Sequence, residues 1–212
     1  MPKAIKEANR IIGAIQDVGN GATQAIKSRE PYRVSVTIQG TCDLLFHRYD
    51  CEAVEEKGRS KKGSKERKTD DIETFVWRNE KGEIGLPGNY LRAAICKAAK
   101  FQQDPRSPRK SAEDIFKAGI HSMTAVASLG TTAWDCVDKQ RVLVQRNAVP
   151  RCRPCFKTGW KATIVLMCVL PEYISPDFLH EVITNAGKLV GVGDYRPSYG
   201  RFNVTEFKVL DD

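Results

Sequence analysis

The sequence lacks any long hydrophobic run. Its longest apolar stretch, residues 162–170, is interrupted by Thr163 and is far shorter than the roughly 18 residues that suggest a membrane span. The segment 1–16 (MPKAIKEANRIIGAIQ) mixes charged residues into its apolar positions and shows no signal-peptide core. We therefore expect neither a membrane protein nor a secreted one, and we predict a cytoplasmic location.

Histidine is also scarce, which limits the acid–base chemistry available. Of the three histidines, His180 lies in a predicted helix where a structural role is expected, whereas His47 is close to Asp43 and Asp50, which could work with it. The run around it (CDLLFHRYD) is equally typical of residues that pack in a core, and no paired histidines or Ser-His-Asp pattern support catalysis. We predict that the protein is not an enzyme. An endoribonuclease centred on His47 or Asp50 is the alternative.

Cysteine is present, but not in the pairs that a metal site needs. Seven is an odd number in a chain too large to require disulfides, so we expect reduced thiols. Cys152-Arg-Pro-Cys155 is a single C-x-x-C motif, whereas a four-ligand zinc site normally needs a second pair at comparable spacing. Cys136 and Cys168 could complete a site only if the fold brought them together. We predict no metal and no cofactor.

Positive charge is in excess and unevenly distributed. The 212 residues include 34 Lys and Arg against 26 Asp and Glu, which gives a net charge of +8 within a composition typical of soluble globular proteins. Residues 57–68 hold seven basic residues and one Glu, and residues 139–161 hold seven basic residues and no acid. Concentrated Lys and Arg neutralise phosphates, so both segments are candidates for binding a polyanion. A solvated, flexible loop is the alternative explanation for residues 57–68.

The apolar periodicities predict an α+β fold. A weak helical stripe places residues 1–30 in an N-terminal helical arm, outside a single domain of residues 31–212. Residues 41–85 form a long basic insertion after the first strand, with a candidate hairpin at 74–86. The remaining patterns run strand 33–39, helix from 88, strand 141–149, strand 160–170, helix 176–187 and strand 201–210. This is the βαββαβ order of a ferredoxin-like (RRM-like) core, with both helices on one face of an antiparallel sheet.

Local signals refine three of these segments. Ser175 is a candidate N-cap for the last helix, Pro176 suits its first position, and Gly187 can end it. Residues 115–129 fit either a helix or a strand. We expect the segment 150–159, which contains Pro and Cys, to form a turn between two strands of the core.

A glycine-rich segment, residues 188–202 (KLVGVGDYRPSYGRF), separates the last helix from the last strand. Its glycines allow sharp turns and close approach to a ligand. Its aromatic and basic side chains suit base stacking and phosphate contact; they are Tyr195, Arg196, Tyr199 and Arg201. Its spacing and its position after a helix do not fit a dinucleotide fingerprint. A structural turn with a basic rim is the alternative.

Two motifs resemble those of the RAMP superfamily, the ferredoxin-like RNA-binding proteins that build CRISPR effector complexes. Gly191-Val-Gly193, followed by Gly200 just before the last strand, is similar to the glycine-rich loop of that family. Residues 86–95 (LPGNYLRAAI) resemble the segment that leads into the first helix of the backbone subunits. The resemblance spans residues 33–210, and the insertion after the first strand resembles the thumb or web of these subunits. The N-terminal arm departs from the pattern, because backbone subunits usually start close to their first strand.

The resemblance implies several RNA contacts. Asn89, Arg92 and Lys97 would contact the RNA backbone near the first helix, whose free N–H groups favour phosphate, and Arg196 and Arg201 would form a second contact. The basic loop would contact RNA or a neighbouring strand through Lys61, Lys62, Lys65, Arg67 and Lys68. On charge alone, we add Arg146, Arg151 and Arg153. We expect Asn89, Arg92, Arg196 and Arg201 to converge on one surface.

We therefore predict a single-stranded RNA-binding (guide-RNA-binding) protein that assembles in several copies along the strand, as in CRISPR effector backbones. Its partners would be RNA, copies of itself and other effector subunits, but no membrane. Two other functions stay open. One is a single-stranded DNA-binding protein of a phage or mobile element, which would lack the contacts to 2′-hydroxyl groups that favour RNA. The other is an inhibitor that mimics a complex subunit and binds only protein.

Overall fold

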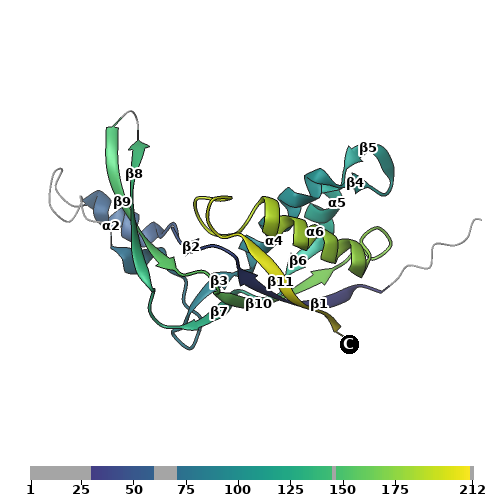
Figure 1. Cartoon of the computed structure of the whole chain (residues 1–212), viewed down its shortest axis with the longest axis horizontal. Coiled ribbons are helices and arrows are strands. Elements are labelled where there is room, and N and C mark those ends of the chain that lie inside the picture. The colour runs from purple at the N-terminus through teal and green to yellow at the C-terminus, as the bar shows by residue number, and fades with distance from the viewer. Residues whose placement is uncertain (1–29, 60–70, 145–146, 211–212) are drawn as a thin grey trace, which may run out of the picture.

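The computed structural model describes residues 30–59, 71–144 and 147–210. The molecule is elongated, with a sheet-and-helix body at one end and a smaller lobe built around a long hairpin at the other (Figure 1). The predicted helical arm and the basic run Lys61–Lys68 lie outside the described residues. No helix in the described part of the chain is long and apolar enough to span a membrane.

The body is built on a four-stranded antiparallel sheet. Its strand order is β11 (Phe202–Leu210), β1 (Tyr32–Gly40), β10 (Lys161–Cys168) and β6 (Ile120–Ser122). Alternate residues of β1 are buried, as the sequence period predicts. The weaker alternation of β11 has a local cause: Thr37 pairs with Glu206 but Ile38 pairs with Val204, so Thr205 is an extra, bulged residue.

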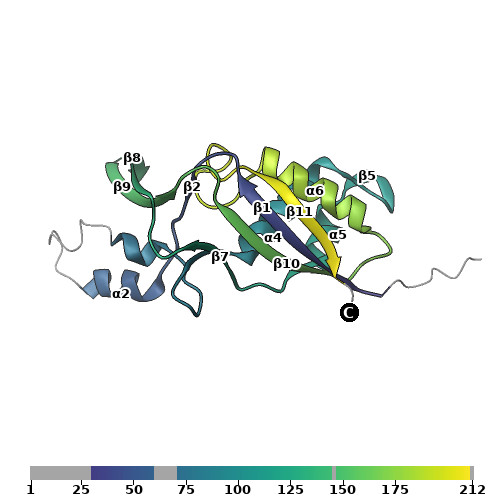
Figure 2. The ribbon, with the colours of Figure 1, turned by 60° about the horizontal axis from the view of Figure 1, so that its bottom comes forward.

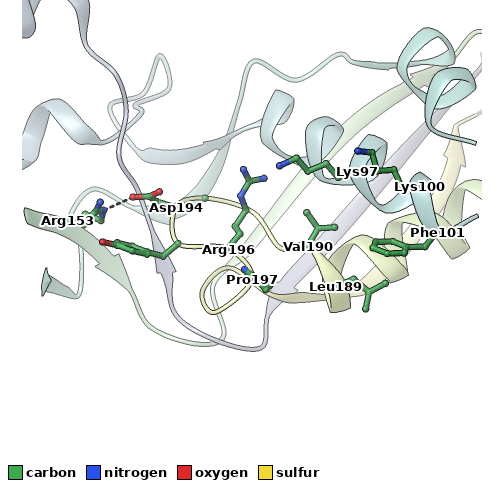
Figure 3. A pocket seen from close by; sticks show the side chains of 11 residues that line it. Lys97, Lys100, Phe101, Arg153, Leu189, Val190, Asp194, Arg196 and Pro197 are labelled. Carbon is green, nitrogen blue, oxygen red and sulfur yellow. Dashed lines mark hydrogen bonds and ion pairs between the residues drawn. The ribbon is translucent and has the colours of Figure 1, made fainter. Parts of the chain in front are cut away.

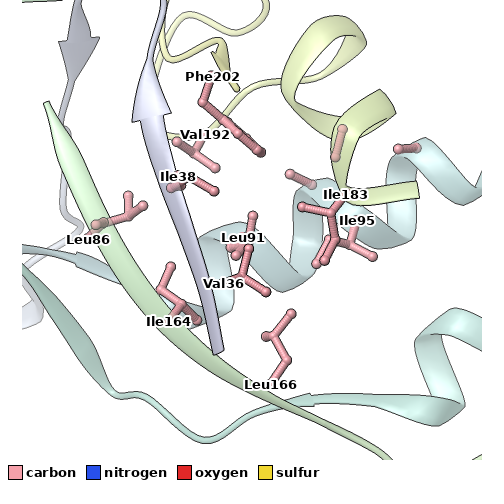
Figure 4. Packing of buried hydrophobic residues seen from close by; sticks show 14 of the residues in the cluster. Val36, Ile38, Leu86, Leu91, Ile95, Ile164, Leu166, Ile183, Val192 and Phe202 are labelled. Carbon is pink, nitrogen blue, oxygen red and sulfur yellow. The ribbon is translucent and has the colours of Figure 1, made fainter. Parts of the chain in front are cut away.

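Helices cover one face of this sheet and leave the other face open (Figure 2). They are α4 (Gly88–Ala98), extended by the 3₁₀ helix η2 (Ala99–Phe101), α5 (Glu113–Gly119) and α6 (Pro176–Leu189). The predicted apolar stripes of α4 and α6 are buried between helix and sheet, together with Val36, Ile38 and Ile164 (Figure 4). Burial of this surface is the main stabilising contribution to the body.

Only the N-terminal end of α6 lies where the sequence predicted it. Ser175 is the N-cap, because its hydroxyl oxygen accepts a hydrogen bond from the backbone N–H of Phe178 at 3.2 Å. Gly187 does not end the helix, which continues to Leu189. A β-carbon at Gly187 would overlap the backbone carbonyl of Phe202, so this glycine lets the helix pack closely on β11.

The smaller lobe corrects the predicted core. Residues 141–149 do not form a core strand: β8 (Cys136–Val144) and β9 (Asn147–Phe156) form a hairpin that, among the described strands, pairs with β2 (Leu44–Leu45) and not with the four-stranded sheet. Residues 150–155 are therefore strand, not a turn. The second strand of the four-stranded sheet, in chain order, is instead β6, within the ambiguous segment 115–129. Only three residues long, β6 carries too short a pattern to be recognised from sequence.

Shorter elements complete the body and the lobe. They are α2 (Cys51–Arg59), the 3₁₀ helix η1 (Ile72–Phe75), β3 (Ile84–Pro87), β4 (Gln103–Asp104), β5 (Ser107–Ser111) and β7 (Val126–Thr131). The predicted hairpin at 74–86 is reduced to one isolated bridge between Arg78 and Ile84, because β3 pairs with β7. The fold is thus a mixed α and β structure with antiparallel sheets.

Candidate functional site

The glycine-rich loop, residues 191–200, connects α6 to β11 at the junction of body and lobe. Its three glycines have positive φ angles of 74°, 80° and 72° at Gly191, Gly193 and Gly200, a conformation that other residues rarely adopt. The close approaches are to the chain itself. A β-carbon at Gly200 would overlap the carbonyl of Val192, and one at Gly193 would lie 2.6 Å from the carbonyl oxygen of Leu45. The glycines therefore make a tight loop and do not by themselves identify a ligand.

Hydrogen bonds hold this loop against the lobe. The backbone N–H of Asp194 donates to the carbonyl of Leu45 at 2.8 Å, and that of Gly200 donates to the carbonyl of Asp43 at 2.8 Å. The Asp194 carboxylate also accepts from the Arg153 Nε on β9, at 2.5 Å. These contacts join the loop to β2 and β9, so the hairpin and the loop form one unit.

Arg153 is an anchor rather than an exposed cation. Its side chain is only 8% exposed, and its guanidinium carbon lies 4.3 Å from the ring centroid of Tyr195, a cation–π contact. Its Nη1 is buried without a hydrogen-bond partner among the described residues. Tyr199 is also tied to the hairpin, since its hydroxyl accepts a hydrogen bond from Gln140 at 3.3 Å. Arg153, Tyr195 and Tyr199 are therefore already engaged in contacts within the protein, and stacking on a base or binding of a phosphate there would have to replace these contacts.

An open cleft of about 710 Å³ lies between the loop and the C-terminal ends of α4 and α6. Four basic side chains and one carboxylate line it, together with apolar residues at one end; they are Lys97, Lys100, Arg153, Arg196, Asp194, Phe101, Leu189, Val190, Pro197, Gly193 and Tyr195. Such a volume is in the range of small-molecule sites.

Lys97 and Arg196 meet inside this cleft. They come from α4 and from the glycine-rich loop, and their charged ends point toward each other (Figure 3). Among the described residues, neither forms an ion pair, whereas Lys100 has Glu113 at 3.5 Å and Arg153 has Asp194. Two like charges that converge without a carboxylate favour the binding of an anion.

The other predicted contacts near α4 are placed differently. Asn89 is exposed in the first turn of α4, about 12 Å along the helix axis from Lys97. Arg92 donates two hydrogen bonds of 2.6 Å, from Nε to the carbonyl of Ile120 and from Nη2 to the carbonyl of Lys117. Its guanidinium therefore fastens α4 to the segment around β6.

The expected convergence of Asn89, Arg92, Arg196 and Arg201 on one surface is not found. Arg92 is bonded to the edge strand β6, and Arg201 is exposed just before β11, which is the opposite edge of the sheet. Arg196 instead joins Lys97. Of the cations chosen on charge alone, Arg151 is partly buried on β9, and the side chain of Arg146 lies outside the described residues.

Asp43, one of the two acidic residues close to His47 in the sequence, is already engaged in hydrogen bonds. The Asp43 carboxylate accepts bonds from Lys157 Nζ at 3.0 Å and from the backbone N–H of Thr158 at 2.8 Å. Burial acts to raise the pKa of Asp43, but these bonds outweigh it and the pKa lies below its usual value. His47 is exposed and its ring centroid lies 4.6 Å from that of Phe75.

Three of the seven cysteines, Cys136, Cys152 and Cys155, lie on the hairpin. Cys152 and Cys155 are three residues apart on β9, so they point to opposite faces of the strand. Cys155 faces Cys136 on β8, and burial with this neighbouring thiol raises its pKa to about 12. Within the described residues, no group of three or more His, Cys, Asp or Glu side chains is placed to hold a metal ion.

Sequence reasoning missed Lys100, Phe101, Asp194 and Leu189. The signal for the first two was available: with Lys97 they occupy positions i, i+3 and i+4 at the end of a helix, and therefore one face. Asp194 and Leu189 carried no comparable signal, because their position depends on how the loop folds back.

Comparisons with known proteins give a structural neighbour but no sequence relative. No family model matches the sequence, and no curated protein matches it. A chain of the Type III-B Cmr-beta structure bound to cognate target RNA, solved by cryo-electron microscopy, is similar in fold, with a TM-score of 0.50 and 10% sequence identity. The alignment covers 93% of this chain and 67% of that chain. At this identity the similarity concerns the fold.

Proposed function

We propose that this protein binds single-stranded RNA as a subunit of a CRISPR effector-like complex, with several copies along one strand. The observation that carries the proposal is the fold similarity over 93% of the chain to a subunit of an RNA-bound Cmr complex. The cleft adds a chemical reason, because Lys97 and Arg196, which have no ion pair within the described part of the chain, suit a phosphate. We propose a non-enzymatic, cytoplasmic role, in which the protein also contacts other effector subunits.

The topology supports the finer assignment to the RAMP superfamily. The sheet order β11-β1-β10-β6, with α4 after β1 and α6 after β10, agrees with the order expected for a ferredoxin-like unit. The glycine-rich loop lies just before β11, where the family has its own. The hairpin β8–β9, rather than the segment 41–85 alone, supplies most of the lobe that corresponds to a thumb.

Binding can be measured with labelled single-stranded RNA over a series of salt concentrations. We expect a steep, largely sequence-independent loss of affinity with salt, and a slope flatter by about 0.7 for each phosphate contact removed by Lys97→Ala or Arg196→Ala. Lys81→Ala, which removes an exposed charge on the turn before β3, is the matched control. If the wild-type protein does not bind RNA at low salt, the proposal is refuted.

Two further measurements separate the alternatives. RNA and DNA of equal length are compared in competition, and preference for DNA would favour a single-stranded DNA-binding protein. Sedimentation with RNAs of increasing length reports assembly: the number of bound copies should rise in steps with length. A single copy at every length would refute assembly along the strand.

A further inference from the structure

The basic cleft has an apolar end that the phosphate contacts do not explain. Phe101 at the end of η2 is 67% exposed, and Leu189 at the end of α6 is 51% exposed. They come from different elements and lie side by side at the same end of the cleft (Figure 3). A large aromatic ring and an aliphatic side chain that meet at the surface of a groove are typical of a site that buries part of a ligand.

The cationic and apolar ends are close together. Lys97 and Phe101 are four residues apart, a spacing that places Cβ atoms roughly 5–6 Å apart on a helix. A ligand that contacts both must therefore join an anionic group to a flat apolar group over a short span. A nucleotide has this chemistry, since its phosphate and its base are connected through one sugar.

Helix electrostatics explains only part of this arrangement. Lys97 and Lys100 lie in the last turn of α4 and in η2, where positive charge stabilises the negative end of the helix dipole. That account gives no reason for Arg196, which the glycine-rich loop directs toward Lys97, or for the exposed Phe101 and Leu189.

We propose that the cleft holds one nucleotide of the bound strand, with its phosphate between Lys97 and Arg196 and its base stacked on Phe101 against Leu189. This inference rests on the proposed function, because it assigns a place to one nucleotide of a strand that the protein binds. It adds that the affinity for the strand depends on the base at this position as well as on the charge of the RNA backbone.

The test compares an oligoadenylate RNA with an abasic strand of equal length, using wild type, Phe101→Ala and the control Tyr49→Ala. Tyr49 is an exposed aromatic residue of the lobe, outside the cleft. Phe101→Ala should weaken binding of the oligoadenylate about ten-fold, as expected for one lost stacking contact. It should leave the salt slope and the abasic affinity unchanged. The double variant Lys97→Ala with Arg196→Ala should flatten the dependence of affinity on salt concentration for both strands.

The outcomes separate the two proposals. If wild type binds RNA with a steep salt slope and Phe101→Ala binds both strands as wild type does, the nucleotide site is refuted and the proposed function stands. If wild type binds neither strand, the proposed function itself is refuted. If Phe101→Ala instead changes self-association without RNA, the apolar end is a contact between protein copies, and the nucleotide site is refuted.

Discussion

Replacing Asp194 by Asn tests whether the ion pair with Arg153 holds the glycine-rich loop in place. The Arg153 side chain is 8% exposed and would lose its only carboxylate partner among the described residues. Removing one partner of a buried ion pair costs about 3–5 kcal/mol. Because Asp194 is 36% exposed, water screens the pair in part, so we expect about 2 kcal/mol. For a chain of this size, that lowers the melting temperature by about 4–8 °C.

Thermal unfolding of four variants measures this effect: Asp194→Asn, Arg153→Met, the double variant of both, and the control Glu80→Gln. Glu80→Gln removes an exposed carboxylate from a turn and should leave the melting temperature nearly unchanged. The double variant Arg153→Met with Asp194→Asn should be more stable than the sum of its single effects predicts, because no buried charge is left without a partner. Additive effects, or an Asp194→Asn melting temperature within about 1 °C of wild type, would refute the reasoning.

Three further predictions follow from local contacts. Gly200→Ala should lower the unfolding free energy by at least about 2 kcal/mol in urea denaturation, because φ is +72° and the β-carbon overlaps Val192; a neutral substitution contradicts this. Arg92→Ala should cost about 2 kcal/mol without changing the salt slope for RNA, since its guanidinium binds two backbone carbonyls; a flatter slope would instead reveal a phosphate contact. Burial acts to raise the pKa of Asp43, but hydrogen bonds led by that from Lys157 hold it below its usual value near 3.9. The stability difference between wild type and Asp43→Asn should therefore shrink as pH falls from about 5 to 3, and a constant difference would contradict it.

The elements that the sequence predicted well are those whose pattern is local and long. Alternation along β1, the apolar stripe of α4 and the cap of α6 at Ser175 each depend on neighbours within a few residues, and the structure confirms all three. The hairpin β8–β9 shows the limit. The predicted single strand 141–149 covers the end of β8 and the start of β9, two antiparallel strands, because its pattern shows neither the reversal of the chain nor which sheet a strand joins.

The candidate site was only partly predictable, for the same reason. Arg196 was found from its place in a glycine-rich loop, and Lys97 from its place on a helix near a family-like motif. Arg92 looked equally suitable, since a basic residue in an amphipathic helix gives no sign of which carbonyls it meets. Only packing showed that Arg92 is bonded to backbone and that Lys97 faces Arg196.

The amino-acid sequence alone determined the excess of positive charge, the periods of the main strands and helices, and the glycines that permit a left-handed loop conformation. These are properties of single residues and of short windows. The tertiary structure decided which cations of the cleft pair with carboxylates, left Lys97 and Arg196 without an ion pair among the described residues, and placed an exposed ring in the same cleft. That choice depends on contacts between segments far apart in the chain, such as α4 with the loop after α6, and no local pattern contains it.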